Sequence, residues 1–375
     1  MSKIICLDIS VLNDKNKTGV GVYTYELIKA LLKINKRDKF ILFGFATFKT
    51  FNFLKNLEFR NYPNVEMKIY KMPAKLFRRL FLFWQKIDWP NIEKLVGPID
   101  IFHSFNWNLP PVKNSKMVAT VFDMTPNLTP NYHQKKTIQL DNVRLNRIRN
   151  KADLVITISE NSKKDFLKFA QGKRTEVIYP GVSDIFMQKI TAAKSKKVLK
   201  KYDLEKGYIL AVGTLEPRKN IRYLIKAYLK SNLAEKLVLV GNWGWEKSDL
   251  LENIKSNKDK IILTGFIPDE DLVYLYHGAL CLVYPSLYEG FGIPILEAMS
   301  CGVSVISSNT SSLPEVGLDA VIYIDPSDID SLVSALRIIK DPQLRTSLIK
   351  KGLQQAKKFS WEKSANKLNQ LYQML

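Results

Sequence analysis

Cysteine is scarce in this chain of 375 residues. Its three cysteines, Cys6, Cys281 and Cys301, lie far apart and form no CxxC pair. This spacing excludes a disulfide framework and a zinc site, and the apolar neighbours of each cysteine predict buried thiols. Long hydrophobic runs are also lacking, since no segment reaches ~20 uninterrupted apolar residues. The start, MSKIICLDIS, enters an apolar strand without a basic leader or a cleavage site. We therefore expect a cytoplasmic protein without a membrane span.

Acidic residues are few beside the basic ones, with 36 Asp and Glu against 57 Lys and Arg, a net charge of +21. Residues 1–180 carry most of the excess, with 31 basic and 15 acidic side chains. Such a surface favours nucleic acid, anionic lipid or a phosphorylated small molecule, and charge alone does not choose among them. Nucleic acid ranks low, because the chain has no RNA-recognition aromatic signature, helix-turn-helix cue or zinc spacing.

The length exceeds the usual size of one hydrophobic core, so two domains are expected. In the first part, a glycine turn with Gly19 and Gly21 joins an apolar strand to a helix that begins near Tyr23. Strand, glycine turn and helix are typical of a Rossmann-like unit. The predicted strands of this part are 4–12, 40–45, 65–70, 100–105, 117–123 and 153–159.

The same alternation restarts after a junction at 181–206. The predicted strands there are 208–214, 236–241, 261–266, 279–285, 303–308 and 320–325. Near-continuous apolar strands separated by helices indicate parallel sheets covered on both faces. The sequence thus predicts an α/β protein with two doubly wound domains, 1–181 and 182–360, facing across a cleft. A helix over 361–375, with apolar residues at helical spacing, is expected to pack back on the first domain.

The most specific motif is YPSLYEGFGIPILEAMSCG at 284–302. A strand ends, a glycine loop follows, and Pro294 stands where a helix would begin. The backbone N–H groups of Gly290, Phe291 and Gly292 would then lie beside a positive helix end, which favours a diphosphate.

Two glutamates of this motif, Glu289 in the loop and Glu297 in the expected first helical turn, are candidates for binding the hydroxyls of a sugar. The alternative is that Glu297 only complements the helix dipole and Glu289 is a solvated loop charge. A second motif, VGTLEPRKN at 212–220, places Arg218 and Lys219 between a strand and a helix. Two cations there can neutralise a leaving diphosphate, although a solvated basic turn is the commoner fate of such a pair.

EGFGIPILEAM together with GTLEPRKN closely resembles family 4 of the retaining glycosyltransferases, which have the GT-B fold. The resemblance covers nearly the whole chain. Its other matching stretches, in the family's order, are TGVGVYTYEL, VATVFDMTP, ADLVITISENSKKD, VIYPGVSDIF, LTGFIPDEDL and SSLPEV.

The resemblance implies a role for each matching residue. Glu289 would contact the donor sugar and Glu297 the nucleotide ribose, while Arg218 and Lys219 would bind the diphosphate. Gly19 and Gly21 would form a loop over the donor in the first domain. The expected donor-binding set is completed by Gly213, Thr214, Gly265, Phe266, Gly290, Phe291, Gly292 and Ile293, with Gly265 and Phe266 near the base.

Two departures from the family pattern stand out. Thr214 replaces an arginine that many members have after the glycine of the second-domain turn. Phe122, followed by Asp123, replaces a histidine at the end of a first-domain strand. The phosphate clamp therefore rests on Arg218 and Lys219.

GTLEPRKN with the D-x-T-P strand end is similar to a bacterial mannosyltransferase branch, which makes GDP-mannose the preferred donor. The expected acceptor is a glycan or lipid-linked saccharide of cell-surface polysaccharide synthesis. No cofactor is expected besides the nucleotide-sugar substrate. No DxD-type metal site presents itself, and a clamp of cations makes a divalent ion unnecessary. Retention is expected through front-face substitution, in which the leaving phosphate accepts the acceptor's proton.

Weaker signals lie in the first domain. His103 and Asp123, each at a strand end, are candidate catalytic residues beside Arg218, Lys219 and Glu289. The alternatives are a structural histidine and a helix or turn cap. An amphipathic stripe over 71–90 either lies on an anionic membrane, at the inner face of the cell membrane, or packs on the sheet.

Other functions remain open. A UDP-sugar-dependent glucosyl- or N-acetylglucosaminyltransferase, or another GT-B enzyme such as a sugar-nucleotide epimerase, would share these motifs.

Overall fold

The computed structural model describes residues 2–13, 18–73, 83–84, 87–105, 109–133, 135–244, 252 and 254–375. By its internal contacts the chain divides into two compact units. Unit 1 comprises Met1–Gly181 and Trp361–Leu375, and unit 2 comprises Val182–Ser360.

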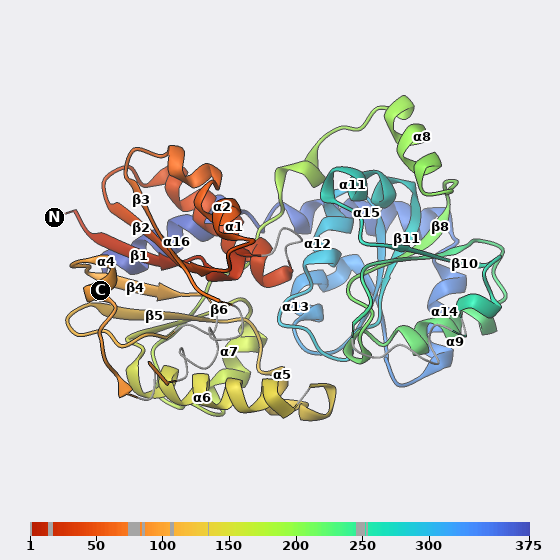
Figure 1. The fold of residues 1–375 in the computed structure, drawn as a ribbon. Coiled ribbons are helices and arrows are strands. Elements are labelled where there is room, and N and C mark those ends of the chain that lie inside the picture. The colour runs from red at the N-terminus through yellow and green to blue at the C-terminus, as the bar shows by residue number, and fades with distance from the viewer. Residues whose placement is uncertain are drawn as a thin grey trace. The chain divides into compact units, whose positions relative to one another are not determined.

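Unit 1 is built on a seven-stranded parallel sheet in the order β3-β2-β1-β4-β5-β6-β7 (Figure 1). The strands are β1 (Ile4–Asp8), β2 (Lys39–Ala46), β3 (Val65–Lys71), β4 (Ile101–Ser104), β5 (Lys116–Val121), β6 (Leu154–Thr157) and β7 (Thr175–Val177). The order reverses between β1 and β4, as in a doubly wound fold. The central strands are buried on both faces, which explains their nearly continuous apolar sequence.

Helices cover this sheet. They are α1 (Gly19–Ile34), α2 (Phe51–Lys55), α4 (Glu93–Val96), α5 (Thr125–Leu128), α6 (Lys135–Lys151), α7 (Glu160–Leu167) and α16 (Trp361–Gln373). At the start of α7 the Ser159 hydroxyl accepts a hydrogen bond from Ser162 N at 2.9 Å, which satisfies one of the helix's unpaired N–H groups.

The C-terminal helix α16 belongs to unit 1, where it lies beside α1 (Figure 1). Asn35 Nδ2 donates to Asn369 Oδ1 at 2.6 Å, and Lys3 Nζ donates to Tyr372 O at 2.9 Å. The Trp361 ring packs edge-on against Tyr23 with centroids 5.6 Å apart. These contacts place the last part of the chain on the first sheet.

Unit 2 repeats the strand order in a six-stranded parallel sheet, β10-β9-β8-β11-β12-β13. The strands are β8 (Tyr208–Val212), β9 (Leu237–Val240), β10 (Ile261–Gly265), β11 (Ala279–Tyr284), β12 (Ser304–Ser308) and β13 (Val321–Ile324). The helices are α8 (Ala192–Lys201), α9 (Ile221–Ser231), α11 (Asp269–Gly278), α12 (Ile293–Ser300), α13 (Leu313–Gly317), α14 (Ile329–Ile338) and α15 (Pro342–Ala356). Its order reverses between β8 and β11.

The sequence predicted twelve of these strands, and the structure differs from it in three places. Strand β7 was missed. The predicted strand 4–12 ends at Asp8, and a 3-10 turn follows over Ser10–Asn13. Gly19 and Gly21 do not form a loop, because α1 already begins at Gly19. The prediction of buried thiols is confirmed for all three cysteines. Within the described part of the chain, no helix combines the length and apolarity needed to cross a bilayer.

Candidate active site

The candidate site of unit 2 lies where strands β8 and β11 end side by side, at the reversal of strand order. Parallel sheets bind ligands at this edge. After β8 the chain turns at Gly213, whose φ of +143° is a conformation that favours glycine. A Cβ at Gly213 would lie 3.4 Å from Lys219 Cε. Gly213 therefore lets Lys219 pass close to the strand end.

Glu289 is the centre of a buried ion cluster. Its Oε1 accepts hydrogen bonds from Lys219 Nζ at 2.6 Å and from the Tyr284 hydroxyl at 3.0 Å. Its Oε2 accepts from Arg218 Nη1 at 2.5 Å. Only 9% of the Glu289 side chain is exposed, against 12% for Lys219 and 16% for Arg218. One carboxylate thus holds both predicted cations.

Further contacts fix the two loops that carry this cluster. Arg218 Nη1 also donates to Tyr288 O at 2.7 Å, and Nη2 donates to Glu216 Oε1 at 2.7 Å. Leu287 N donates to Arg218 O at 2.9 Å. Glu289 N donates to the Ser311 hydroxyl at 2.9 Å. The loops after β8 and β11 are therefore joined through both backbone and side chains.

Electrostatics keep the Glu289 carboxylate ionised. Burial alone would raise its pKa, but Arg218 and Lys219 lower the pKa to about 2. Burial lowers the pKa of Lys219, and the adjacent Glu289 opposes that shift. Burial and the nearby Glu289 raise the pKa of Tyr284 well above its usual range, so Tyr284 stays a neutral donor. The cluster is a preformed arrangement of fixed charges, which is what transition-state stabilisation requires.

The helix of the glycine motif begins one residue earlier than predicted. Gly292, with a φ of +111°, precedes α12, and Pro294 is the second residue of α12. The first turn contains no acidic residue, so the prediction that placed Glu297 there is wrong. The reason is that the helix starts at Ile293 and Glu297 is its fifth residue. The Phe291 side chain is buried edge-on against Phe359, and its carbonyl oxygen accepts a hydrogen bond from the Ser312 hydroxyl at 2.9 Å.

Glu297 lies outside the Glu289 cluster and makes a separate hydrogen bond. Its Oε2 accepts from the hydroxyl of Tyr276, on α11, at 2.8 Å. Burial raises the pKa of Glu297 to about 8, against the opposing effect of Tyr276. The structure therefore does not join the two glutamates by a contact, and Glu297 is set to carry a proton at neutral pH.

The remaining predicted donor residues of unit 2 follow the other strands. Thr214 is exposed after β8. Gly265, with a φ of +73°, ends the edge strand β10, and Phe266 next to it is 45% exposed. Gly241 N donates to Gly265 O at 2.9 Å, and a Cβ at Gly241 would lie only 2.0 Å from Gly213 O. Close backbone packing thus connects these turns.

In unit 1, His103 has the contacts of a structural histidine. It is fully buried, its Nδ1 bonds to the Tyr372 hydroxyl, and its Nε2 lies 2.8 Å from Thr120 Oγ1. The ring also stacks on Phe105 with centroids 4.0 Å apart. Burial lowers the pKa of His103 to about 3. Both ring nitrogens are occupied inside the protein.

Asp123 caps a turn through one of its oxygens. Its Oδ1 accepts from Thr125 N at 2.9 Å and from the Thr125 hydroxyl, at the start of α5. Gly19 and Gly21 form the first turn of α1, and a Cβ at Gly19 would meet no atom within 4 Å. The amphipathic stripe at 71–90 falls largely outside the described residues.

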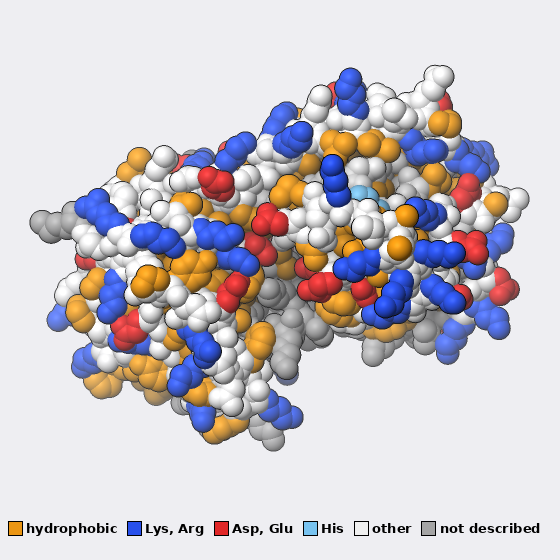
Figure 2. Space-filling model, turned by 90° about the horizontal axis from the view of Figure 1, so that it is seen from above, with side chains coloured by type: hydrophobic (Ala, Val, Ile, Leu, Met, Phe, Trp, Pro, Cys, Tyr) orange, Lys and Arg blue, Asp and Glu red, His pale blue; other side chains and the backbone are white. Residues whose placement is uncertain are grey.

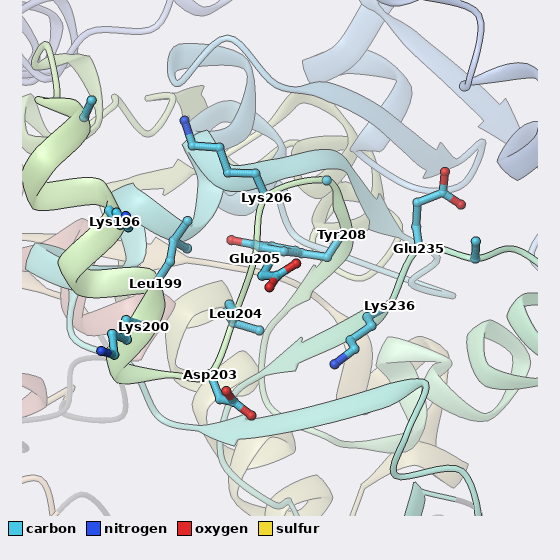
Figure 3. A pocket seen from close by; sticks show the side chains of 13 residues that line it. Lys196, Leu199, Lys200, Asp203, Leu204, Glu205, Lys206, Tyr208, Glu235 and Lys236 are labelled. Carbon is cyan, nitrogen blue, oxygen red and sulfur yellow. The ribbon is translucent and has the colours of Figure 1, made fainter.

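The described residues of unit 2 line a large hollow and a small one. The larger, about 900 Å³, lies by the start of β8 and the turn before β9, and Lys200, Lys206, Tyr208 and Lys236 are among its lining (Figure 3). It includes none of the predicted donor residues. A small hollow at the other end of the strands is lined by Gly213, Lys219, Tyr284 and Ser286 among others. We place the candidate site there because the charged groups converge there.

Comparison with known proteins identifies the family. The chain is 33% identical to the O-antigen chain mannosyltransferase B of Escherichia coli over 380 residues, which cover 96% of each protein. The chain belongs to glycosyltransferase family 4. It matches the model "Glycosyltransferase Family 4" over residues 17–184 and "Glycosyl transferases group 1" over residues 193–355. The O-antigen chain mannosyltransferase RfbU of Salmonella typhimurium is 31% identical over half of each chain.

Solved structures of other proteins confirm the predicted GT-B fold. The sucrose-phosphate synthase of Thermosynechococcus elongatus superposes with a TM-score of 0.77, at 22% identity and over 99% of this chain and 98% of that one. WaaG, a glycosyltransferase involved in lipopolysaccharide biosynthesis, gives a TM-score of 0.71 at 14% identity, over 97% of this chain and 98% of that one. At these identities the likeness shows the fold alone.

Three residues of this glycosyltransferase's site were not singled out from the sequence. Glu216 accepts a hydrogen bond from Arg218. The Tyr284 hydroxyl accepts one from Lys219 and donates one to Glu289. The Ser311 hydroxyl accepts one from Glu289 N. Glu216 and Ser311 lie inside the family-like stretches GTLEPRKN and SSLPEV, and Tyr284 is the first residue of the motif at 284–302. The motifs therefore pointed to the right loops, but spacing along the chain does not show which side chains meet across them.

Proposed function

We propose that this glycosyltransferase transfers a mannosyl residue from GDP-mannose to a glycan or lipid-linked saccharide during cell-surface polysaccharide synthesis, such as that of O-antigen, capsule or exopolysaccharide. The observation that carries the donor half is the Arg218–Lys219–Glu289 cluster at the ends of β8 and β11. The mannose preference is supported by the 33% identity with a mannosyltransferase along nearly the whole chain.

In this proposal Arg218 and Lys219 bind the diphosphate, and the backbone before α12 adds N–H groups at a positive helix end. Gly292, immediately before that helix, adopts a positive φ, and a Cβ there would lie 2.8 Å from Leu313 Cδ2, so glycine is needed for the turn into α12 to pack against α13. Glu289, which the two cations keep ionised, accepts hydrogen bonds from hydroxyl groups of the donor sugar. Glu297 binds the ribose. Arg218 and Lys219 already pair with Glu289, so in this proposal the two cations contact both Glu289 and the incoming diphosphate.

The proposed reaction retains configuration through front-face substitution. The bond from the acceptor oxygen to the anomeric carbon forms on the face from which the phosphate leaves. The bond from the anomeric carbon to the phosphate oxygen breaks, and that oxygen takes the acceptor's proton. Arg218 and Lys219 stabilise the charge that grows on the diphosphate. No metal ion is needed in this scheme.

The test is transfer with three donors, GDP-mannose, UDP-glucose and UDP-N-acetylglucosamine, followed by analysis of the sugar and the anomer in the product. Transfer of an α-linked mannose from GDP-mannose alone supports the proposal, since the sugar in that donor is α-linked. A β-linked product contradicts retention. Transfer from a UDP-sugar alone favours a glucosyl- or N-acetylglucosaminyltransferase, an alternative that the UDP-glucose complex of the similarly folded HepE makes worth testing.

A nucleic-acid-binding function is the alternative from another class. On the face drawn in Figure 2, Lys and Arg side chains are spread over the described parts of both units, with Asp and Glu among them. A mobility-shift assay at physiological salt tests this alternative, and salt-sensitive binding there would revive it.

We also propose that the protein acts in the cytoplasm, at the inner face of the cell membrane, where a lipid-linked acceptor would lie. Within the described residues, Phe83 and Trp89 are each 61% exposed in unit 1, and aromatic rings at a surface suit a membrane interface. The test is co-sedimentation with anionic liposomes at low salt, using the wild type and Trp89→Ala. Absence of binding contradicts the proposal.

A further inference from the structure

A second polar cluster lies in unit 1, at the end of β5 and beside helix α6. It brings together Asp123, His133, Asp141 and Arg144. Arg144 Nη1 lies 3.7 Å from Asp141 Oδ1, and Nη2 donates to Thr120 O. Asp123 and His133 are near enough to act on the charge of Asp141. Side chains from β5, α6 and the segment between them therefore converge on one place.

A structural role in joining α6 to β5 explains only some of the polar atoms in this cluster. The Arg144 guanidinium ties α6 to β5 through Thr120 O, which explains one of its nitrogens. Among the described residues, Nε of Arg144 is buried without a hydrogen-bond partner, and so is Nε2 of His133. Only 12% of the Arg144 side chain and 16% of Asp141 are exposed. Buried donors and acceptors are nearly always paired, so the hydrogen bonding inside this cluster is incomplete.

The oxygens of the carboxylates point to the same conclusion. Oδ1 of Asp123 is used by Thr125, whereas Oδ2 has no hydrogen bond among the described residues. Asp141 contacts Arg144 through Oδ1 only at 3.7 Å, which is too long for a strong hydrogen bond. Burial raises the pKa of Asp141 in spite of Arg144, and Asp123 adds to the rise. Two acceptors beside a buried cation are thus incompletely satisfied.

The charge of the cluster selects the class of ligand. The two carboxylates, Asp123 and Asp141, offset the positive charge in the cluster, so it does not offer the excess of positive charge that a phosphate requires. Carboxylate oxygens and guanidinium N–H groups instead match sugar hydroxyls, each of which donates one hydrogen bond and accepts others. The carboxyl edge of a parallel sheet is where such ligands bind.

We infer that Asp123, Asp141 and Arg144 bind the hydroxyls of an uncharged sugar residue of the acceptor, and that the acceptor end held by this cluster carries no phosphate. The inference rests on the proposed function, since it takes unit 1 to be the acceptor-binding unit. It deepens that proposal by naming the chemical class of the acceptor terminus and the residues that select it.

The test compares methyl α-mannoside with mannose 6-phosphate by isothermal titration. It uses the wild type, Asp141→Asn, Arg144→Gln and the matched control Arg149→Gln, which changes an exposed arginine of the same helix. The neutral glycoside is expected to bind the wild type and Arg149→Gln equally. The two cluster variants are expected to weaken it at least about 10-fold. Mannose 6-phosphate is expected to bind more weakly than the glycoside.

Three results would overturn the inference: no binding of methyl α-mannoside to the wild type, equal binding by the cluster variants, or tighter binding of mannose 6-phosphate. Thermal unfolding shows whether a variant has folded. Should Arg144→Gln be unfolded, Arg144→Lys keeps the charge but not the planar fork, and should still weaken the glycoside. Failure of the proposed function would be seen separately, as a wild type that binds the glycoside but not GDP-mannose.

Discussion

Lys219 Nζ lies 2.6 Å from Glu289 Oε1, although the two residues come from loops after different strands. The other oxygen of the same carboxylate is held by Arg218. Glu289 is therefore oriented from both sides before any ligand arrives. Such preorganisation spares the protein the cost of arranging its charges during the reaction.

Replacing Lys219 by alanine should lower turnover about 100-fold or more, because one fixed cation at the leaving diphosphate is lost. The matched control is Lys226→Ala, which removes an exposed lysine of the neighbouring helix α9. Initial rates with saturating donor measure the effect. Near-normal turnover in Lys219→Ala, with the control also normal, would remove Lys219 from the chemistry.

Glu289→Gln should separate binding from turnover. Turnover should fall about 100-fold, since the donor sugar loses a charged acceptor, whereas affinity for GDP should hold or increase, because Arg218 and Lys219 are no longer neutralised. Breaking the buried ion pairs should also cost about 3 kcal/mol in the free energy of unfolding. Isothermal titration, rates and urea unfolding measure the three effects. Weaker binding of GDP would argue against this account, and Glu270→Gln on the exposed part of α11 is the control.

The donor loops were predictable from the sequence, whereas the contacts across them were not. EGFG and PRK identify the loops because glycine, proline and paired cations have local physical reasons to stand there. Tyr284 gives no such signal: a tyrosine ending an apolar strand is indistinguishable from a core residue until β8 and β11 are placed side by side. The fourth member of the cluster, Tyr284, therefore came only from the fold.

Two errors from the sequence have local causes. Strand β7 contains just three residues, Thr175–Val177, too few to show an apolar run. Gly19 and Gly21 suggested a loop because glycine disfavours helices. In the structure Gly21 is buried within α1, so tertiary packing overrides that preference.

The raised pKa of Glu297 predicts that the stability of the protein depends on pH. Its pKa of about 8 in the folded protein lies above the usual 4.5, so the folded state binds more protons between these values. The contribution of this proton to the free energy of unfolding is complete below about pH 4.5 and is lost as the pH rises through 8. Glu297→Gln cannot ionise. The melting temperature of Glu297→Gln minus that of the wild type should therefore increase from pH 5 to pH 9. A constant difference would contradict the raised pKa.

His103 should prove structural. His103→Phe removes hydrogen bonds to Thr120 and Tyr372 and should lower the free energy of unfolding by about 1–3 kcal/mol. The turnover of the folded variant should stay within about 3-fold of the wild type. Calorimetry and rates on the same sample measure both. A loss of turnover without a loss of stability would return His103 to the list of catalytic candidates.

The central claim is that Arg218 and Lys219 bind the diphosphate of the donor. Isothermal titration of GDP-mannose into the wild type, the double variant Arg218→Ala/Lys219→Ala and the control Lys226→Ala tests it most directly. The account predicts binding to the wild type and to the control with the same Kd, and a Kd at least about 100-fold higher in the double variant. Equal affinity in all three proteins, or no binding to the wild type, would contradict it.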